Sequence, residues 1–233
     1  LNFFTYISHE FKTPLTLIIA TLEQMMSQEE ISQKQNKYGT LMRKSAMRLL
    51  FLINQLMDFR KIETDHASIV LNKGEIVGFI KSSFEAFYPL MEKLSIKGEF
   101  SSNIDSYIVY FDPDKLEKIL SNLISNSCKS MKESGTISVL VKIKELVHPA
   151  NPSDSGEKTS DIVITIKDDG PGLSPSKLKQ IFQPFYSDDI SGIQSSGIGL
   201  SLVKSLVKYL NGHIDVRSSE KKGTKFTIQL PLI

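Results

Sequence analysis

Residues 3–15 read FFTYISHEFKTPL and open a helix around which the rest of the chain is organised. In its register, His9 lies beside an apolar stripe, so its imidazole is expected to meet solvent next to a helical partner. Glu10 follows directly, and Thr13 shares the face of His9 one turn later. Pro14 has no backbone N–H, so we expect a bend just after these residues. The stripe steps by four, three, four and three residues, as in a coiled coil: Phe11, Leu15, Ile18, Leu22 and Met25.

A second long helix is predicted over residues 32–63 because its apolar positions repeat the same spacing. Together with a first helix over residues 2–28, it predicts an antiparallel hairpin joined by a short polar turn. Two such hairpins form a four-helix bundle, so a homodimer is expected. The alternative is that the apolar seam packs on the chain's own second domain. The positions of the second helix are Met42, Ser45, Leu49, Leu52, Leu56 and Phe59.

The remainder of the chain changes to shorter helices and alternating strands. We therefore predict an α+β chain, with a helical hairpin over residues 1–66 and a two-layer α/β domain over residues 67–233. Residues 64–73 are expected to act as a hinge, and residues 148–160 as a polar loop. Helices are predicted at residues 75–93, 111–131, 174–181 and 198–210, and strands at 68–71, 96–100, 107–110, 136–147, 162–166, 213–218 and 224–230.

Composition excludes several classes of function. The 28 basic and 26 acidic residues give a net charge of +2, which does not indicate a nucleic-acid surface. The single Cys128 rules out an internal disulfide and a cysteine-based zinc site. No apolar run is long enough to span a bilayer. Because the chain begins at Leu1, within a helix, we expect a fragment, and a membrane anchor could lie upstream of it.

One polar face is predicted on the helix at residues 111–131. Asn122 and Asn126 lie one turn apart, and Lys118 and Lys129 fall near the same face. Amide oxygens and ammonium groups together suit a magnesium ion and phosphate oxygens. Taken alone, such a face is more often simply solvated.

Residues 167–173, KDDGPGL, directly follow a predicted strand. A carboxylate before two glycines, Gly170 and Gly172, lets the backbone turn sharply and approach a ligand closely. Asp168 and Asp169 are both candidates for this carboxylate. The alternative is an ordinary turn from a strand to a helix, since Asp-Gly turns are common.

Residues 197–202, GIGLSL, lead into the last helix. Glycines at a helix start leave N–H groups that can hold phosphate oxygens, assisted by the helix dipole. Residues 187–196 before them are small and polar, as expected of a mobile lid over a nucleotide. No Walker-A pattern occurs, so the site is not that of a P-loop protein.

In chain order, these stretches resemble the H, N, G1, F and G2 boxes of sensor histidine kinases, at residues 9–14, 116–126, 168–172, 181–186 and 197–202. The second domain is similar to the Bergerat-type ATP-binding domain that these kinases share with heat-shock-90 chaperones, type II topoisomerases and mismatch-repair ATPases. Ile198 and Ser201 depart from the usual threonine and third glycine of the G2 box, and Ser130 stands where an aromatic residue is common. The H-box is most similar to hybrid two-component sensors of the Bacteroides group.

The resemblance implies a protein-histidine kinase that uses ATP and Mg²⁺ and autophosphorylates His9. Glu10 would act as a general base or orient the ring. The phosphoryl group would pass to an aspartate on the receiver domain of a response regulator, and Thr13 would position water for dephosphorylation of that aspartate. The expected partners are a second copy and a receiver domain, with no nucleic-acid or membrane contact by this fragment. The chain would be the cytoplasmic portion of an inner-membrane sensor.

The resemblance also implies the roles of the nucleotide site. Asn126 would coordinate Mg²⁺, and Asp168 would accept a hydrogen bond from the adenine amino group. The phosphates would lie by Lys118, Asn122 and Lys129. The glycine-rich turns would contribute Gly170, Gly172, Gly197, Gly199 and Leu200.

Two other functions remain open at this point. One is a non-catalytic dimerising module that binds nucleotide or a receiver without transfer. The other is an ATP-driven clamp of the heat-shock-90 or topoisomerase type, which would lack the H-box hairpin. The sequence does not determine whether attack occurs within one chain or across the dimer.

Overall fold

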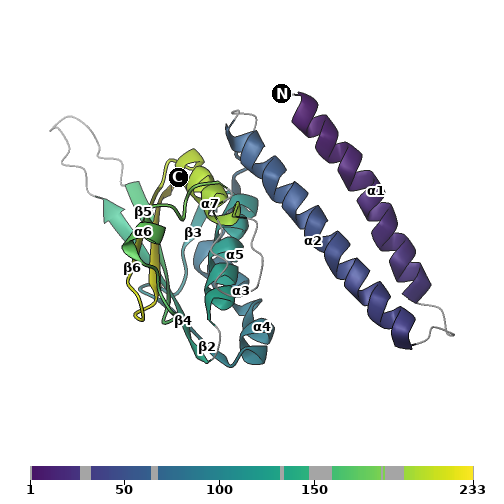
Figure 1. The fold of residues 1–233 in the computed structure, drawn as a ribbon. Coiled ribbons are helices and arrows are strands. Elements are labelled where there is room, and N and C mark those ends of the chain that lie inside the picture. Colours follow the sequence, from purple (N-terminus) through teal and green to yellow (C-terminus); the bar gives the residue numbers. More distant parts are fainter. Residues whose placement is uncertain are drawn as a thin grey trace. The chain divides into compact units, whose positions relative to one another are not determined.

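The chain forms two compact units in a computed structural model, Leu1–Ala67 and Ser68–Ile233 (Figure 1). The structure describes residues 2–26, 33–63, 68–131, 134–146, 159–184, 186 and 197–232. Most of the predicted loop at residues 148–160 and the whole predicted lid at residues 187–196 lie outside these ranges. Within the described ranges, no helix has the length and apolar character needed to cross a membrane.

The first unit is a hairpin of two long helices, α1 (Asn2–Met26) and α2 (Gln33–Glu63), as predicted (Figure 1). Pro14 lies inside α1, which continues as a helix beyond it. The hairpin has a small apolar core in which Leu15 and Ile19 of α1 meet Ala46 of α2. Leu50 and Ile53 of α2 pack against this core.

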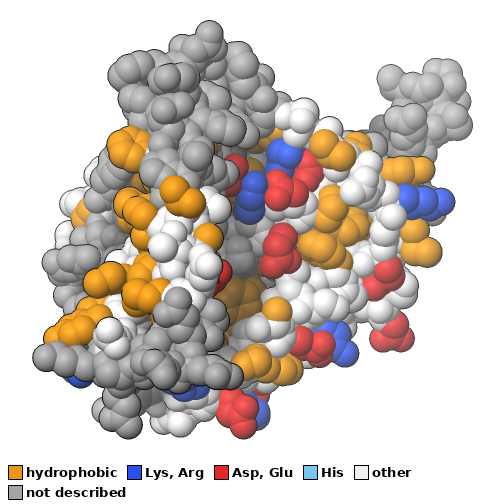
Figure 2. Space-filling view, turned by 90° about the vertical axis from the view of Figure 1, so that its right-hand side faces the viewer, with side chains coloured by type: hydrophobic (Ala, Val, Ile, Leu, Met, Phe, Trp, Pro, Cys, Tyr) orange, Lys and Arg blue, Asp and Glu red, His pale blue; other side chains and the backbone are white. Residues whose placement is uncertain are grey.

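The apolar stripe predicted for α1 divides between two faces of the helix. Leu15 and Leu22 are buried, whereas Phe11, Ile18 and Met25 remain 56%, 49% and 39% exposed. Because the exposed residues recur every seven positions, they form a second apolar face along the helix. Figure 2 shows hydrophobic side chains gathered over the described part of the hairpin. On α2 the exposed apolar residues are Tyr38, Leu41, Met42, Met47, Leu49 and Phe51.

The second unit is a mixed five-stranded sheet in the order β2-β4-β5-β7-β6. β2 (Ile96–Ser102) runs parallel to β4 (Gly135–Leu146), and the other pairs are antiparallel, formed by β5 (Thr159–Asp168), β7 (Thr224–Leu232) and β6 (His213–Ser218). Helices α3 (Ile76–Glu85), α5 (Pro113–Ser130) and α7 (Gly199–Tyr209) cover one side of this sheet (Figure 1). The predicted two-layer architecture is therefore confirmed.

The core of this unit lies between the sheet and its helices. Apolar residues alternate along β4 and β5, so every second side chain faces the helices. The helix α5 meets them with residues spaced by three and four. The fully buried residues of these elements are Leu116, Ile119, Leu120, Leu123, Ile124, Ile137, Val139, Val141, Ile162, Ile164 and Ile166.

Two predicted elements differ from the structure. The strand expected at residues 68–71 is instead β1 (Asn72–Glu75), which pairs antiparallel with β3 (Ile108–Phe111). The single helix expected at residues 75–93 is interrupted between α3 and α4 (Tyr88–Lys93). The interruption falls just before Pro89, which lacks a backbone N–H and so favours a new helix start.

Candidate active site

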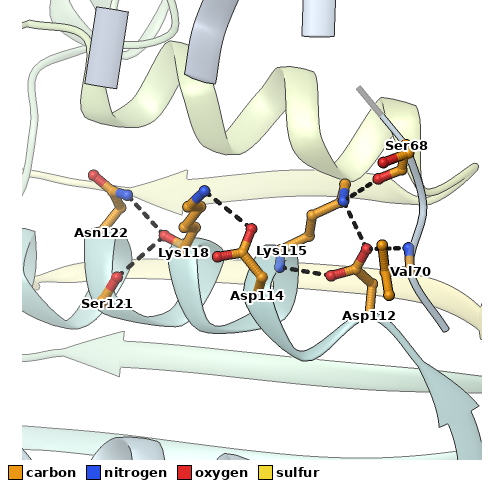
Figure 3. Close-up of polar contacts among 8 residues, drawn as sticks. All are labelled: Ser68, Val70, Asp112, Asp114, Lys115, Lys118, Ser121 and Asn122. Carbon is orange, nitrogen blue, oxygen red and sulfur yellow. Dashed lines mark hydrogen bonds and ion pairs between the residues drawn. The ribbon is translucent and has the colours of Figure 1, made fainter. Parts of the chain in front are cut away.

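The predicted phosphate-side residues lie along one face of α5. Asp112 caps the helix by accepting a hydrogen bond from the backbone N–H of Lys115 at 3.1 Å. One turn later, Lys118 forms an ion pair with Asp114, with Nζ 3.0 Å from Oδ2 (Figure 3). The side-chain amide of Asn122 donates to the backbone oxygen of Lys118 at 2.7 Å. Because their atoms are held within α5, these side chains are positioned by the helix itself.

Asn126 and Lys129 occupy the last turns of α5. Asn126 is half-buried, and Lys129 is exposed. Described residues offer the Asn126 side chain no hydrogen-bond partner, so its amide oxygen remains able to accept a ligand. They also contain no cluster of three or more histidine, cysteine or acidic side chains suited to a metal. A magnesium ion fits here only if Asn126, water and phosphate oxygens share its coordination, a ligand set that Mg²⁺ accepts.

Asp168 is the last residue of β5 and is 3% exposed. Its Oδ1 atom accepts hydrogen bonds from the backbone N–H groups of Gly170 and Thr224, both at 3.1 Å. Its Oδ2 atom accepts one from the Ser127 hydroxyl, also at 3.1 Å. Burial raises the pKa of Asp168, and the three hydrogen bonds offset this only in part. The carboxylate is thus fixed in orientation, and Oδ2 keeps the capacity to accept one further donor.

Asp169, the competing carboxylate, has a different environment. It is exposed, and its Oδ1 atom accepts a hydrogen bond from the backbone N–H of Thr136 at 2.8 Å. Its own N–H donates to the Thr136 oxygen at 3.3 Å. These contacts tie the end of β5 to β4, so they give Asp169 a structural role beside Asp168.

The turn after Asp168 is packed tightly against the turn between β6 and β7. Gly172 has φ +68, and a Cβ there would lie 2.0 Å from the Ser219 oxygen. Gly223 has φ +80, and its Cβ would lie 1.9 Å from the Asp168 oxygen. Only glycine fits both the backbone angle and the space at these two positions. The predicted sharp turn at residues 170–172 is therefore coupled to a second glycine turn at Gly223, which no sequence motif indicated.

The N-terminus of α7 follows Gly197, which has φ +65. No side chain caps this helix at Ile198, and Gly199 and Leu200 lie in its first turn. Their N–H groups therefore point out of the helix end, where a phosphate group is favoured. The hydroxyl of Ser201, which replaces a glycine of the G2 box, is buried and donates to the Ile198 oxygen at 2.8 Å.

Two residues of the site were missed from the sequence: Ser127 and Thr224, which hold Asp168. Ser127 falls on the buried stripe of α5, where a hydroxyl among apolar residues signals a buried partner. Thr224 follows Gly223 and opens β7, where its Cα pairs with that of Asp168. Thr224 could not be found from the sequence because β5 and β7, which bring it to Asp168, are distant in the sequence.

The expected phosphoacceptor His9 and the two residues expected to act beside it lie in the other unit. The backbones of His9, Glu10 and Thr13 all belong to α1. Their side chains fall outside the described part of the structure, so their roles stay predictions.

Comparisons with known proteins cover both units. Residues 1–65 match the His Kinase A (phospho-acceptor) domain, and residues 111–233 match the Histidine kinase-, DNA gyrase B-, and HSP90-like ATPase family. The chain belongs to the histidine kinase family. A phosphoacceptor domain ahead of the ATPase domain separates this kinase core from the ATP-driven clamps, which were expected to lack the hairpin.

Relatives of this kinase core align along its whole length. It is 36% identical over all of its residues to Histidine kinase P4 from Formosa agariphila, and 31% identical over 99% to the sensor histidine kinase YclK from Bacillus subtilis. It spans only 16% and 46% of those two proteins. The full-length structure of ShkA in complex with AMPPNP shares its fold with a TM-score of 0.80 at 23% identity, over 99% of this chain and 46% of that one.

Proposed function

We propose that this chain is the catalytic core of a sensor histidine kinase, which transfers the γ-phosphoryl group of ATP to His9. The observation that carries the proposal is that one chain holds both parts of the reaction. A phosphoacceptor domain contains His9, and an ATPase domain contains a buried, hydrogen-bonded Asp168. Asp168 Oδ2 would accept the adenine amino group, which distinguishes adenine from guanine.

In this reaction the unprotonated imidazole nitrogen of His9 attacks the γ-phosphorus in line with the leaving group. A nitrogen–phosphorus bond forms as the bond to the β,γ-bridging oxygen breaks, and ADP leaves. Glu10 accepts or orients the proton on the other ring nitrogen, which makes the imidazole more nucleophilic. Mg²⁺, when bound, would neutralise charge on the phosphoryl oxygens, and Asn126 would hold it.

The phosphates would lie between α5 and the start of α7. Lys118, Asn122 and Lys129 supply charged and amide donors from α5. The turns on either side supply backbone N–H groups at close approach. These turns contain Gly170, Gly172, Gly197, Gly199 and Leu200.

Dimerisation through the hairpin is part of the proposal. The exposed face of α1 at Phe11, Ile18 and Met25 recurs with the period of a coiled-coil seam. Exposed Met42 and Leu49 continue such a face on α2. Two hairpins joined along these faces would bury them in a four-helix bundle.

The phosphoryl group would then pass from His9 to an aspartate of a receiver domain. A relative from Vibrio parahaemolyticus, 28% identical over 99% of this chain, is named autoinducer 2 sensor kinase/phosphatase LuxQ. We extend both activities to this chain, with Thr13 positioning the water that dephosphorylates the receiver. We also propose that the full-length protein is a membrane sensor with this core in the cytoplasm.

The test is incubation of the chain with γ-labelled ATP and Mg²⁺, beside His9→Gln. Acid-labile, base-stable label is expected in the parent chain and none in the variant. Label that persists in His9→Gln would contradict the assignment of the acceptor. Nucleotide binding without label in either protein would instead support a non-catalytic module.

A further inference from the structure

The chain enters the ATP-binding unit through a segment held by a buried ion pair. Lys115 and Asp112 form this pair at the start of α5, with Nζ 2.6 Å from Oδ2 and side chains that are 10% and 1% exposed. The Lys115 ammonium also donates to the backbone oxygen of Ser68 at 2.6 Å. Asp112 Oδ2 accepts the backbone N–H of Val70 at 2.8 Å (Figure 3). Two charged side chains therefore fix the backbone of residues 68–70.

Side-chain burial is only one part of what holds this segment, because its apolar residues stay partly exposed. Ile69, Val70 and Leu71 are apolar but 43%, 57% and 40% exposed. Burying apolar area is the usual way to hold a chain segment, and here about half of that area still faces solvent. Within the described part of the chain, the hydrogen bonds to Asp112 and from Lys115 hold the backbone at residues 68–70, and the pairing of β1 with β3 follows directly.

The same ion pair is continuous with the nucleotide-binding face. Lys115, Lys118 and Asn122 follow one another at intervals of three and four, so they share one stripe of α5 (Figure 3). Asp112 is the N-cap of that helix. A rigid helix thus joins the anchored segment to the residues assigned to the phosphates. The hinge expected at residues 64–73 cannot bend within residues 68–73 unless these bonds break.

We propose that Asp112 and Lys115 are positioning residues for phosphoryl transfer, which fix the entering segment at residues 68–70 onto the helix that holds the nucleotide. This inference rests on the proposed function. Transfer requires that His9 reach the γ-phosphate from the other unit, and residues 68–70 lie on the covalent path between them. Loosening that path would lower the rate of transfer, because a misplaced acceptor costs rate without affecting nucleotide binding.

The sharpest test compares Val70→Pro with Val70→Ala. Proline removes the backbone N–H that Asp112 accepts, whereas alanine keeps it. Both variants lose the same exposed valine side chain, so they differ mainly in that N–H. For Val70→Pro we expect the initial rate of phosphohistidine formation to fall about tenfold, as for loss of a hydrogen bond to a charged group. The dissociation constant of a fluorescent ATP analogue should stay within about twofold of the parent value, and Val70→Ala should behave as the parent.

A second test changes the ion pair itself. The double variant Asp112→Asn with Lys115→Met leaves no single buried charge, and Lys115→Arg keeps the cation. Hydrogen exchange at the Val70 amide should rise about tenfold in the double variant, with the same loss of transfer rate. Lys115→Arg should keep most of the parent chain's transfer rate and most of its protection of the Val70 amide from exchange.

Full transfer rate in Val70→Pro, or in a folded double variant whose Val70 amide exchanges rapidly, would overturn the proposal. So would a loss of nucleotide affinity as large as the loss of rate. If the parent chain forms no phosphohistidine at all, the proposed function itself fails. The exchange at Val70 then still reports whether the anchor exists.

Discussion

At the scale of single residues, Asp168 is the side chain that we propose recognises the adenine base. Its Oδ1 atom accepts two backbone N–H groups, while Oδ2 accepts, among the described residues, only the Ser127 hydroxyl. This asymmetry leaves Oδ2 as the atom for an exocyclic amino group. To accept that amino group, Asp168 must stay charged while it is buried, and burying a charge is unfavourable for folding.

Asp168→Asn should therefore weaken ATP binding without destabilising the fold at neutral pH. An amide would offer its N–H₂ group where the adenine amino group also donates, and we expect about a tenfold or greater loss of affinity.

The same carboxyl should make folding stability depend on pH. Because burial raises the pKa of Asp168 in the folded chain, its stabilisation of the fold is fully present below the ordinary pKa of the carboxyl, and it is lost as pH rises through the raised value. Titration calorimetry and thermal unfolding check both effects, and unchanged affinity would count against the assignment.

Gly223→Ala should damage the site through the backbone. A Cβ at this position meets the Asp168 oxygen, and alanine at φ +80 is strained by about 1–3 kcal/mol before that clash is added. We expect a lower midpoint of urea unfolding and weaker nucleotide binding. Gly74→Ala is a useful comparison, because Gly74 has no positive φ and its Cβ would meet only the Phe111 side chain, at 3.2 and 3.6 Å. Equal stability of Gly223→Ala and the parent chain would contradict this reading.

At the scale of elements, α5 connects three features: the sheet, the nucleotide face and the entering segment. Burial raises the pKa of Asp112, but the hydrogen bonds from Lys115 and Val70 lower it by more. The pKa of Asp112 therefore lies below the ordinary value. The stabilisation from this depressed pKa is present above about 3.8, the ordinary value, and is lost as pH falls through the folded value.

Lys115→Met should consequently destabilise the ATP-binding unit at neutral pH. It leaves the Asp112 charge buried without its partner, which typically costs about 3–5 kcal/mol. The loss should shrink as pH falls toward the range where Asp112 is protonated. Lys81→Met is the matched control, since its ion pair with Glu85 is solvent-exposed and should change stability by less than about 0.5 kcal/mol. A destabilisation independent of pH would argue that packing of the lysine chain matters more than its charge.

The hairpin offers a separate prediction about its exposed apolar face. Ile18→Glu places a charge on the face at Phe11, Ile18 and Met25, and it should shift the chain from dimer to monomer in sedimentation analysis. Ala20→Glu is a fair control because Ala20 is also exposed on α1 but lies on the opposite side of the helix from Ile18. A dimer unaffected by Ile18→Glu would mean that another surface joins the two copies.

At the scale of the whole molecule, the sequence predicted most elements because their periodicities are strong. The long helices, β4, β5 and α5 all follow from the spacing of apolar residues. The strand at residues 68–71 was wrong because side chains of Asp112 and Lys115, distant in the sequence, take up its backbone groups. Likewise, the heptads of α1 gave the apolar positions but not their division between the hairpin core and an exposed face.

The site was predictable where a motif is contiguous and hidden where it is assembled by strand pairing. Asp168 and its glycines stand together in the sequence, whereas Thr224 reaches Asp168 only through the register of β5 with β7. Ser127 depends on how α5 packs against the sheet. The roles of His9, Glu10 and Thr13 remain predictions, since only their helical backbone is described.

The central claim is that the ATP-binding unit phosphorylates His9 of the helical unit. The most direct measurement is site-resolved: incubation with ATP and Mg²⁺, then location of the phosphoryl group by tandem mass spectrometry at neutral pH, with Asn126→Ala beside the parent chain. We expect phosphate on His9 in the parent chain and none in Asn126→Ala. Phosphate on another residue, or ATP hydrolysis without any phosphohistidine, would contradict it.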